Sequence, residues 1–473
     1  MSALAIEQPG VAERVTTGRP GQFKPKASKE TEAARRRSAL NAQQNEARSG
    51  RIADVRRVAL EAFLGGESVN DIEAEVEVED ENDEDGDEVA DFDMGDAGDA
   101  GKKMRRLRRL HRTLFFARQL QMPDWMLEVP SDLSTSWLML TRPEGERCLL
   151  LSDGGRVEVR RKSGFMHERY TDSRLPRGLT ILDVVCVEGS VDEDESQQPE
   201  AAAMDAAPEA DCNMDEANGR GKGRGKGTAR GRGRRGRPQG ERTYAVCDVI
   251  MWGDTELDSA TAECRIFWLE SRFAELGPRP RRARPLELVP AVAATSDALH
   301  DAYYGESTHP KDALVFLNRE GHYCMSEPVT PLVLMWRDRR LSRYVVDTPD
   351  KKGLMRPERQ AVVLELRGGG HLRTADKIIV AQLEGEALEK AQQLDPKNKG
   401  RALIRVEVDG VDLVSRRLMG GLQVVAHVPA RSRVWPDSWG RIAFQHIHRQ
   451  NSSEAVSIDD LVQVAAGAAQ PAG

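Results

Sequence analysis

The sequence is poor in aromatic residues and has no long apolar run. Aromatic side chains make up 5% of the 473 residues, whereas 31% of the residues are charged. No stretch reaches the roughly 18 consecutive apolar residues that a membrane-spanning helix requires. The first residues also lack the basic region and apolar core of a secretory signal. We therefore expect neither a transmembrane helix nor a signal peptide.

The six cysteines have neither Cys-x-x-Cys spacing nor close histidine partners. Structural zinc sites and disulfide frameworks depend on such patterns. Most of the cysteines stand in apolar, strand-like runs, which predicts that they act as small core residues in a reducing compartment. We expect no bound metal and no cofactor. The cysteines are Cys148, Cys186, Cys212, Cys247, Cys264 and Cys324.

The formal net charge of −8 hides a strong separation of charge along the chain. Basic residues dominate the N-terminal region and 219–237, whereas acidic residues dominate 71–99 and 190–216. Blocks of like charge are typical of solvated tails and linkers. The pattern predicts an acidic disordered linker at 65–104. It also predicts a disordered insertion at 190–240, whose Arg/Gly-rich part either binds RNA phosphates loosely or is simply tolerated.

Residues 28–64 have the pattern of an arginine-rich helix. Ser28 can cap its start, and Gly65 with Gly66 can end it. The helix has little apolar surface with which to dock on its own domain. We therefore expect it to become ordered on a partner; the alternatives are a basic RNA-binding arm or a solvated helix.

From Trp125 onward, short runs of β-forming residues alternate with Gly, Pro and Asp turns. The pattern predicts an α+β fold that is rich in antiparallel sheet and is not doubly wound, in a domain spanning 105–350. Residues 351–473 continue as a strand-rich C-terminal extension. The predicted strands are TSWLMLTRP, RCLLLSDGG, RVEVRRKSG, LTILDVVCVEG, RTYAVCDVIMW, AECRIFWLESRF, DALVFLNREGHY and TPLVLMW, then AVVLELRGGG, ALIRVEVDGV, LQVVAHVP and GRIAFQHIH.

In two separate regions the sequence resembles the snurportin family. The first is RPGQFKPK at 19–26 with the arginine-rich helix that follows, which is similar to an importin-β-binding segment. The second comprises MPDWMLEVPSDL, RKSGF, LTILDVVCVEG, YAVCDVIMWGDTEL, CRIFWLESRF and HYCMSEPVTPLVLMW, in the order of the family's cap-binding domain. The tail is more similar to the plant and algal forms than to the animal ones.

The resemblance implies a nuclear import adaptor that binds the 2,2,7-trimethylguanosine cap of spliceosomal small nuclear RNAs and links the particle to importin-β. It implies a fold similar to that of mRNA guanylyltransferases, and shuttling between nucleus and cytoplasm. The importin-binding residues that it implies are Arg19, Phe23, Lys24, Arg35, Arg36, Arg37, Arg48, Arg51, Arg56 and Arg57. Residues 1–18 have a spacing that loosely fits a signal for the leucine-rich-signal export receptor.

The resemblance also implies the cap contacts. Trp336 corresponds to the aromatic platform for the methylated base, and Trp125 to a second tryptophan at the pocket. Lys162 matches a lysine directed at the cap phosphates, and Arg147 lies in another cap-contacting segment. Pro123 stands in place of a serine of the animal form, Glu146 replaces a basic residue, and Trp336 is offset by one residue from the TPLV run.

Two other functions fit parts of the sequence. A guanylyltransferase needs a nucleophilic lysine in a Lys-x-Asp-Gly motif, and the chain contains none, because Lys162 is followed by Ser163 and Gly164. We therefore expect a protein that is not an enzyme. A generic Arg/Gly-rich RNA-binding protein would instead depend on 219–237 and would ignore the cap.

Overall fold

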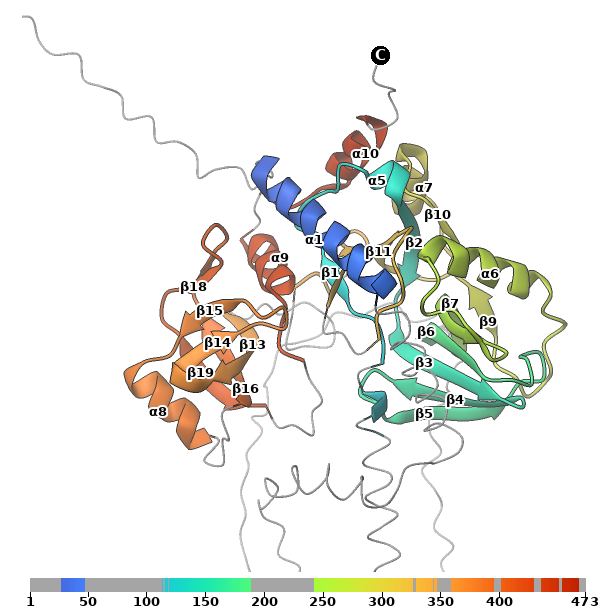
Figure 1. Ribbon diagram of the computed structural model, residues 1–473, viewed down its shortest axis with the longest axis horizontal. Helices are drawn as coiled ribbons and strands as arrows, with labels where there is room; N and C mark the ends of the chain where they lie inside the picture. Colours follow the sequence, from blue (N-terminus) through green and yellow to red (C-terminus); the bar gives the residue numbers. More distant parts are fainter. Residues whose placement is uncertain are drawn as a thin grey trace, which may run out of the picture. The chain divides into compact units, whose positions relative to one another are not determined.

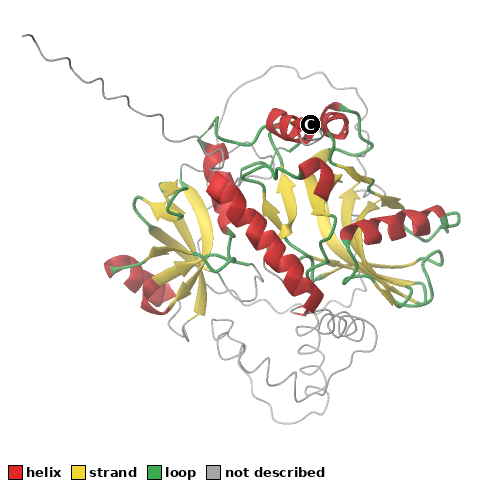
Figure 2. Cartoon of the chain, turned by 45° about the horizontal axis from the view of Figure 1, so that its top comes forward, coloured by secondary structure: helices red, strands yellow, loops and turns green. Residues whose placement is uncertain are grey.

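The computed structural model describes residues 27–46, 113, 115–117, 119–188, 242–325, 329–342, 344–346, 359–394, 401–428, 435–450 and 453–467. Within 27–46, side chains are described only for 35–44. The export segment at 1–18, the linker at 65–104 and the insertion at 190–240 lie outside these residues. Strands dominate the described part of the chain (Figure 2).

The first sheet has five strands, and most of its pairings are antiparallel (Figure 1). Its strand order is β1 (Pro123–Trp125), β12 (Thr330–Trp336), β11 (Lys311–Asn318), β2 (Trp137–Pro143) and β10 (Ala291–Ala293). Only β1 and β12 run in parallel here. The central strands carry apolar residues at nearly every position, as expected for a sheet that is covered on both faces.

The second sheet is built around β3, β6 and β7. Its strand order is β5 (Met166–Thr171), β4 (Arg156–Arg161), β3 (Glu146–Asp153), β6 (Thr180–Glu188), β7 (Arg242–Trp252) and β8 (Thr255–Glu256), with β9 (Leu286–Leu288) parallel to β7. A large hydrophobic cluster joins residues of both sheets, among them Leu140, Leu150, Val185 and Val315. This shared core places the two sheets around one interior.

A third sheet forms in the C-terminal region. Its order is β15 (Ile379–Gln382), β14 (His371–Arg373), β13 (Gln360–Arg367), β16 (Arg401–Val408) and β19 (Gln423–His427), and the hairpin of β17 (Gly410–Asp412) and β18 (Arg417–Met419) lies beside it. This sheet has its own hydrophobic cluster, which includes Leu364, Ile404 and Ile442. The strand-rich C-terminal extension is therefore folded.

The described helices are short apart from α1 (Ala27–Glu46), which has twenty residues. The others are α5 (Leu133–Ser136), α6 (Ala262–Ala274), α7 (Ser296–Tyr304), α8 (Gly385–Leu394), α9 (Trp439–Arg449) and α10 (Ile458–Gly467). Helices α7 and α10 contribute Leu299, Ile458 and Leu461 to a cluster that also contains Trp137 of β2. The α+β, antiparallel-rich fold class predicted from the sequence is confirmed.

Two predicted strands are helices in the structure. The run AECRIFWLESRF forms α6, where the Thr261 hydroxyl accepts a hydrogen bond from Cys264 N at 3.3 Å. This N-cap satisfies one of the free amides of the first turn, and Ala262, Ile266 and Leu269 recur at helical spacing on the buried face. The run GRIAFQHIH forms most of α9, which Ser438 caps in the same way. The prediction of strands for these two runs took no account of the capping residues Thr261 and Ser438.

Candidate functional site

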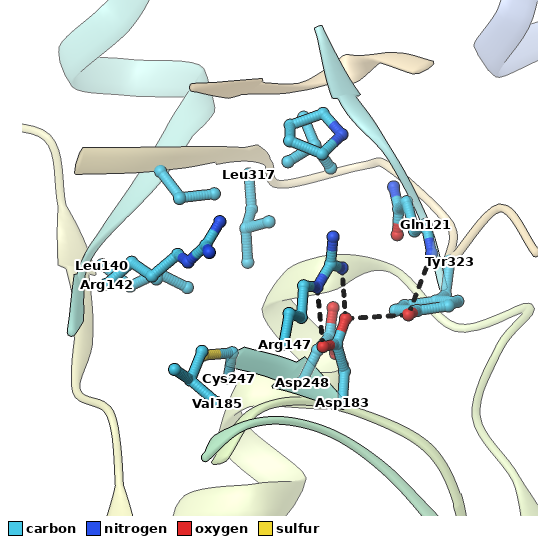
Figure 3. A pocket seen from close by; sticks show the side chains of 13 residues that line it. Gln121, Leu140, Arg142, Arg147, Asp183, Val185, Cys247, Asp248, Leu317 and Tyr323 are labelled. Atoms are coloured by element: carbon cyan, nitrogen blue, oxygen red, sulfur yellow. Dashed lines mark hydrogen bonds and ion pairs between the residues drawn. The ribbon is translucent and has the colours of Figure 1, made fainter. Parts of the chain in front are cut away.

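A pocket lies where residues of the first and second sheets meet (Figure 3). Its empty space is about 460 Å³, a volume that includes open solvent. Apolar residues of β2, β11 and β12 form one part of the lining, and residues of β3, β6 and β7 form another. Gln121, Pro123 and Tyr323 complete it. The lining residues are Gln121, Pro123, Leu140, Arg142, Arg147, Asp183, Val185, Cys247, Asp248, Val315, Leu317, Tyr323 and Val333.

A buried polar network crosses this pocket from Arg147 to Tyr323. Arg147 donates from Nε to Asp183 Oδ1 at 2.9 Å and forms a second, shorter contact from Nη2 to Oδ2. Tyr323 donates its hydroxyl to Asp183 Oδ2 at 2.8 Å and accepts from Gln121 N at 3.1 Å. Burial would lower the pKa of Arg147, but the charge and hydrogen bonds of Asp183 raise it. The guanidinium therefore stays charged and fixed in position.

Asp248 forms a second ion pair at the pocket. Its carboxylate accepts from Arg265 Nε at 2.8 Å and from Nη2 at 2.9 Å. Arg265 is 1% exposed, and its Nη1 also donates to Gly321 O at 3.0 Å. A buried charge needs partners of this kind, because leaving it unpaired is strongly destabilising. The pair thereby holds the segment that carries Tyr323.

Arg142 differs from these arginines because its contacts are weak. Its Nη2 lies 3.5 Å from Asp312, and its Nη1 lies 4.0 Å from the sulfur of Met335. Its buried Nε has no hydrogen-bond partner among the residues that the structure describes. Sequence reasoning missed this residue, although an arginine within the apolar run WLMLTRP was a usable signal. Arg142 offers the pocket a cationic donor that can turn to a ligand.

Lys162 lies in the turn between β4 and β5. Its side chain is exposed. Desolvation by the surrounding protein, followed by the positive charges of Arg147, Arg441 and Arg142, lowers its pKa to about 8. Arg147 and Arg142 line the pocket, so the Lys162 ammonium lies within the positive electrostatic potential of these two residues. Of the four predicted cap contacts, Arg147 lines the pocket and Lys162 lies near it.

Trp336, the residue that the resemblance implies as the aromatic platform, is not open to solvent. Its side chain is 0% exposed, and its indole Nε1 donates to Val456 O at 2.9 Å. Alternate residues of a strand face opposite sides. Val333 and Met335 belong to the cluster that includes the pocket wall, whereas Leu334 and Trp336 belong to the cluster under α7 and α10. The one-residue offset from TPLV therefore turns the indole away from the pocket.

Trp125 is partly buried beside the pocket wall. It pairs with Met335 in the β1–β12 register and packs against the cluster that contains Val315 and Val333. The Arg337 guanidinium lies 5.2 Å from the centre of its ring, and the Phe444 ring lies 4.5 Å away. Phe444 comes from α9, so the C-terminal region contributes directly to the surroundings of this tryptophan.

The predicted importin-binding residues fall only partly within the described side chains. Arg35 and Arg36 are exposed on α1, and Arg37 lies 5.7 Å from the centre of the Trp137 ring. The other predicted residues lie outside the described side chains: Arg19, Phe23, Lys24, Arg48, Arg51, Arg56 and Arg57.

Contrary to expectation, α1 does contact its own domain. Gln44 is 1% exposed. Its side chain accepts from His322 N at 3.0 Å and donates to Cys324 Sγ at 3.4 Å. The contact is polar, which is why apolar periodicity did not reveal it. The two partners of Gln44, His322 and Cys324, directly precede and follow the pocket residue Tyr323 in the sequence.

Two kinds of site are absent from the described residues. No group of three or more His, Cys, Asp or Glu side chains there could hold a metal ion. None of the described helices combines the length and apolar character needed to span a membrane.

Comparison with known proteins gives one family match and weak structural likenesses. Residues 119–193 and 237–337 match the family model of the Snurportin1 m3G cap-binding domain. The ligase domain of LigD from M. tuberculosis aligns with a TM-score of 0.29 and 13% identity, covering 67% of this chain and 96% of that one. A mycobacterial DNA ligase D complexed with ATP and MES gives 0.28 and 14%, covering 68% and 99%. TM-scores this low support no inference about this chain.

Proposed function

We propose that the pocket between the two sheets binds the m3G cap of an RNA. The observation that carries this proposal is the overlap between pocket and family match. All 13 lining residues fall within 119–193 or 237–337. The family match therefore covers pocket residues from both sheets, although the insertion separates the two matched ranges in the sequence.

The composition of the pocket suits a methylated purine. The base of this cap is flat and positively charged, and its methyl groups remove the N2 donor pair that a carboxylate reads in guanine. Leu140, Val315, Leu317 and Val333 supply apolar surface for methyl groups. Trp125 is the aromatic residue that we assign to contact the base, in place of Trp336. Stacking on an aromatic ring contributes about 1–3 kcal/mol per base.

Two cations are assigned to the polar parts of the cap. The carbonyl oxygen O6 remains an acceptor after methylation. Arg142 lines the pocket, and its buried Nε has no hydrogen-bond partner among the described residues. We assign Arg142 to this oxygen, because arginine is a common partner of guanine O6. Lys162 is exposed beside Arg147 and is assigned to the phosphate bridge. Arg147 itself is held by Asp183 and acts as a fixed positive charge.

The wider role that we propose is that of a nuclear import adaptor. The arginine-rich segment at 19–64 would bind importin-β, whose solenoid fold presents a long concave surface to a helix. The exposed Arg35 and Arg36 on α1 support this assignment. Binding of spliceosomal small nuclear RNA particles, shuttling between nucleus and cytoplasm, and recognition by the export receptor belong to the same proposal. The match ends at residue 337, so kinship of the tail with plant and algal forms stays a prediction.

Cap binding is tested by titrating the full chain with trimethylguanosine and monomethylguanosine cap analogues and following tryptophan fluorescence. We expect saturable binding with preference for the trimethylated cap. Equal affinity for both, or binding of neither, would overturn the proposal. Incubation with labelled GTP and magnesium should give no covalent adduct after denaturing electrophoresis. A labelled band would instead support the guanylyltransferase alternative.

A further inference from the structure

One side-chain amide of the pocket has no partner in the protein. Gln121 lines the pocket near Arg147 and Tyr323 (Figure 3) and is 2% exposed. Its buried Nε2 has no hydrogen-bond partner among the described residues. Buried polar groups are normally hydrogen-bonded, because an unpaired one is costly. An apolar side chain of similar size would fill the same space without this cost, so packing alone does not account for a glutamine here.

The backbone around Gln121 is held in place by hydrogen bonds. Gln121 N donates to the Tyr323 hydroxyl at 3.1 Å, and that hydroxyl donates to Asp183 Oδ2 at 2.8 Å. The carbonyl oxygen of the next residue, Met122, accepts from Thr330 N at 2.9 Å. The amide therefore extends from a fixed backbone, and rotation about its own side-chain bonds is enough to turn it toward a ligand.

Gln121 and Arg142 lie on opposite sides of the pocket, with Arg147 between them (Figure 3). Arg142 contacts Met335, and Met335 pairs with Trp125 in the β1–β12 register. The base that we assign to Trp125 and Arg142 therefore belongs to the Arg142 side. The ribose joins this base to the phosphate bridge, so it extends from the base toward the side that carries Gln121 and Arg147.

The chemistry of a carboxamide also favours the ribose. The group is neutral and carries donors on Nε2 and an acceptor at Oε1. Phosphate oxygens bind charged donors more strongly than neutral ones, and N2 of the methylated base has no hydrogens left to donate. The terminal nucleoside of a cap is linked through its 5′ position, so its 2′- and 3′-hydroxyls are both free. Two neighbouring hydroxyls match the donor and the acceptor of one amide.

We propose that the Gln121 amide binds the 2′- and 3′-hydroxyls of the methylated nucleoside, with Nε2 donating to one hydroxyl oxygen and Oε1 accepting from the other hydroxyl. This inference rests on the proposed function, because it takes the pocket to hold the cap. A nucleotide within an RNA chain has its 3′ oxygen in a phosphodiester and lacks one of these donors. Gln121 therefore makes the pocket select a terminal nucleoside over the same base inside an RNA.

The experiment titrates the full chain with two ligands: the trimethylguanosine cap mononucleotide, and the same compound with both ribose hydroxyls replaced by fluorine. Fluorine adds little bulk and cannot donate a hydrogen bond. The unmodified chain should bind the fluorinated ligand about tenfold more weakly, the order expected for loss of one or two neutral hydrogen bonds. Gln121→Met should weaken binding of the hydroxylated ligand by a similar factor and should leave affinity for the fluorinated ligand unchanged.

Gln382→Met is the matched control, because Gln382 of β15 is exposed and does not line the pocket. It should distinguish the two ligands as the unmodified chain does. Thermal unfolding of both variants shows whether each is folded. The comparison of the two ligands on the unmodified chain requires no variant, so it tests the assignment even if Gln121→Met does not fold.

The outcomes separate this inference from the proposed function. If the unmodified chain does not bind the cap mononucleotide, the proposed function fails. If it binds both ligands with equal affinity, the ribose assignment is overturned and the proposed function stands. A Gln121→Met variant that binds both ligands more weakly by the same factor would place the amide on the base, and that result also overturns the ribose assignment.

Discussion

Among single residues, Arg142 is the pocket cation whose charge is least committed to protein partners. Arg147 and Arg265 each bind a carboxylate through two nitrogens. Arg142 makes only two long contacts among the described residues, to Asp312 and to the sulfur of Met335. A guanidinium with weak protein contacts contributes more binding free energy to a ligand than one that must first break a strong ion pair. The pocket therefore combines fixed charges with one adaptable donor.

Arg142→Met should weaken cap binding by about 1.5–3 kcal/mol, the usual contribution of a hydrogen bond to a charged group. The measurement is the dissociation constant of the cap mononucleotide, with thermal unfolding recorded in parallel. Arg169→Met serves as the control, because the Arg169 side chain is 61% exposed and pairs with Glu158 away from the pocket lining. Equal affinities of both variants and the unmodified chain would contradict the role of Arg142.

Because the pKa of Lys162 is lowered, we expect cap affinity to depend on pH. Its pKa in the free protein is about 8, and a bound phosphate must raise that pKa because it favours the charged ammonium. The phosphate contact is therefore fully present below about pH 8 and is lost as pH rises through the pKa of the bound state. Affinity should fall over this range by up to about tenfold per pH unit.

The measurement is the ratio of dissociation constants for the unmodified chain and Lys162→Arg, taken from about pH 7 to pH 10. Arginine stays charged throughout this range, and any titration of the cap itself is common to both proteins. The ratio should rise with pH. A ratio that stays flat would remove Lys162 from the phosphate site.

At the scale of single elements, a shift of one residue along strand β12 changes which side chain faces the pocket. Met335 faces the pocket side and contacts Arg142, while the next residue, Trp336, is buried under α7 and α10. Substitution of Trp336 should therefore affect mainly the stability of the protein, whereas substitution of Trp125 should affect mainly cap affinity.

Trp336→Ala should lower the free energy of unfolding by about 3–5 kcal/mol, the usual cost of truncating a buried aromatic residue. Cap affinity of the folded protein should change little. Trp125→Ala should instead reduce cap affinity by about 1–3 kcal/mol through lost stacking. Chemical denaturation and cap titration of both variants provide the measurements. The assignment of Trp125 fails if Trp336→Ala alone reduces affinity.

Helix α1 is held on its own domain by Gln44, and the proposed importin-β complex must release that contact if the receptor surrounds the helix. Gln44→Ala should therefore raise the affinity for importin-β by about threefold to tenfold, equivalent to one lost intramolecular hydrogen bond. Gln43→Ala is the matched control, because the neighbouring Gln43 is exposed. Lower affinity in Gln44→Ala alone would show that Gln44 binds the receptor directly.

At the scale of the whole molecule, the cap-binding region draws on distant parts of the chain. Helix α10 supplies Ile458, Leu461 and Ala465 to the core around Trp336, beyond the predicted domain boundary at 350. Phe444 of α9 contacts Trp125. The full chain is therefore the appropriate protein for measurements of cap affinity.

The insertion between the two matched segments should be dispensable for the cap. Deleting 194–236, the gap between the matched ranges, should leave cap-mononucleotide affinity unchanged within error, because no pocket residue belongs to this stretch. Fluorescence titration of the deletion variant measures this. A large loss would favour the alternative of an Arg/Gly-rich RNA-binding protein.

The sequence alone determined most of the strands and the separation of charge. These features follow from local rules, since alternating apolar residues, turn residues and blocks of like charge act over a few positions. The antiparallel α+β class followed from the same patterns.

Only the tertiary structure decided which strand residues reach the pocket. Arg147, Asp183 and Tyr323 are separated by 36 and 140 positions, so their network depends on how the strands pair. The direction of Trp336 depends on β12 register, and the anchoring of α1 depends on two hydrogen bonds between Gln44 and a segment about 280 residues away. No local pattern encodes such contacts, because each is fixed by the packing of elements that are distant in the sequence.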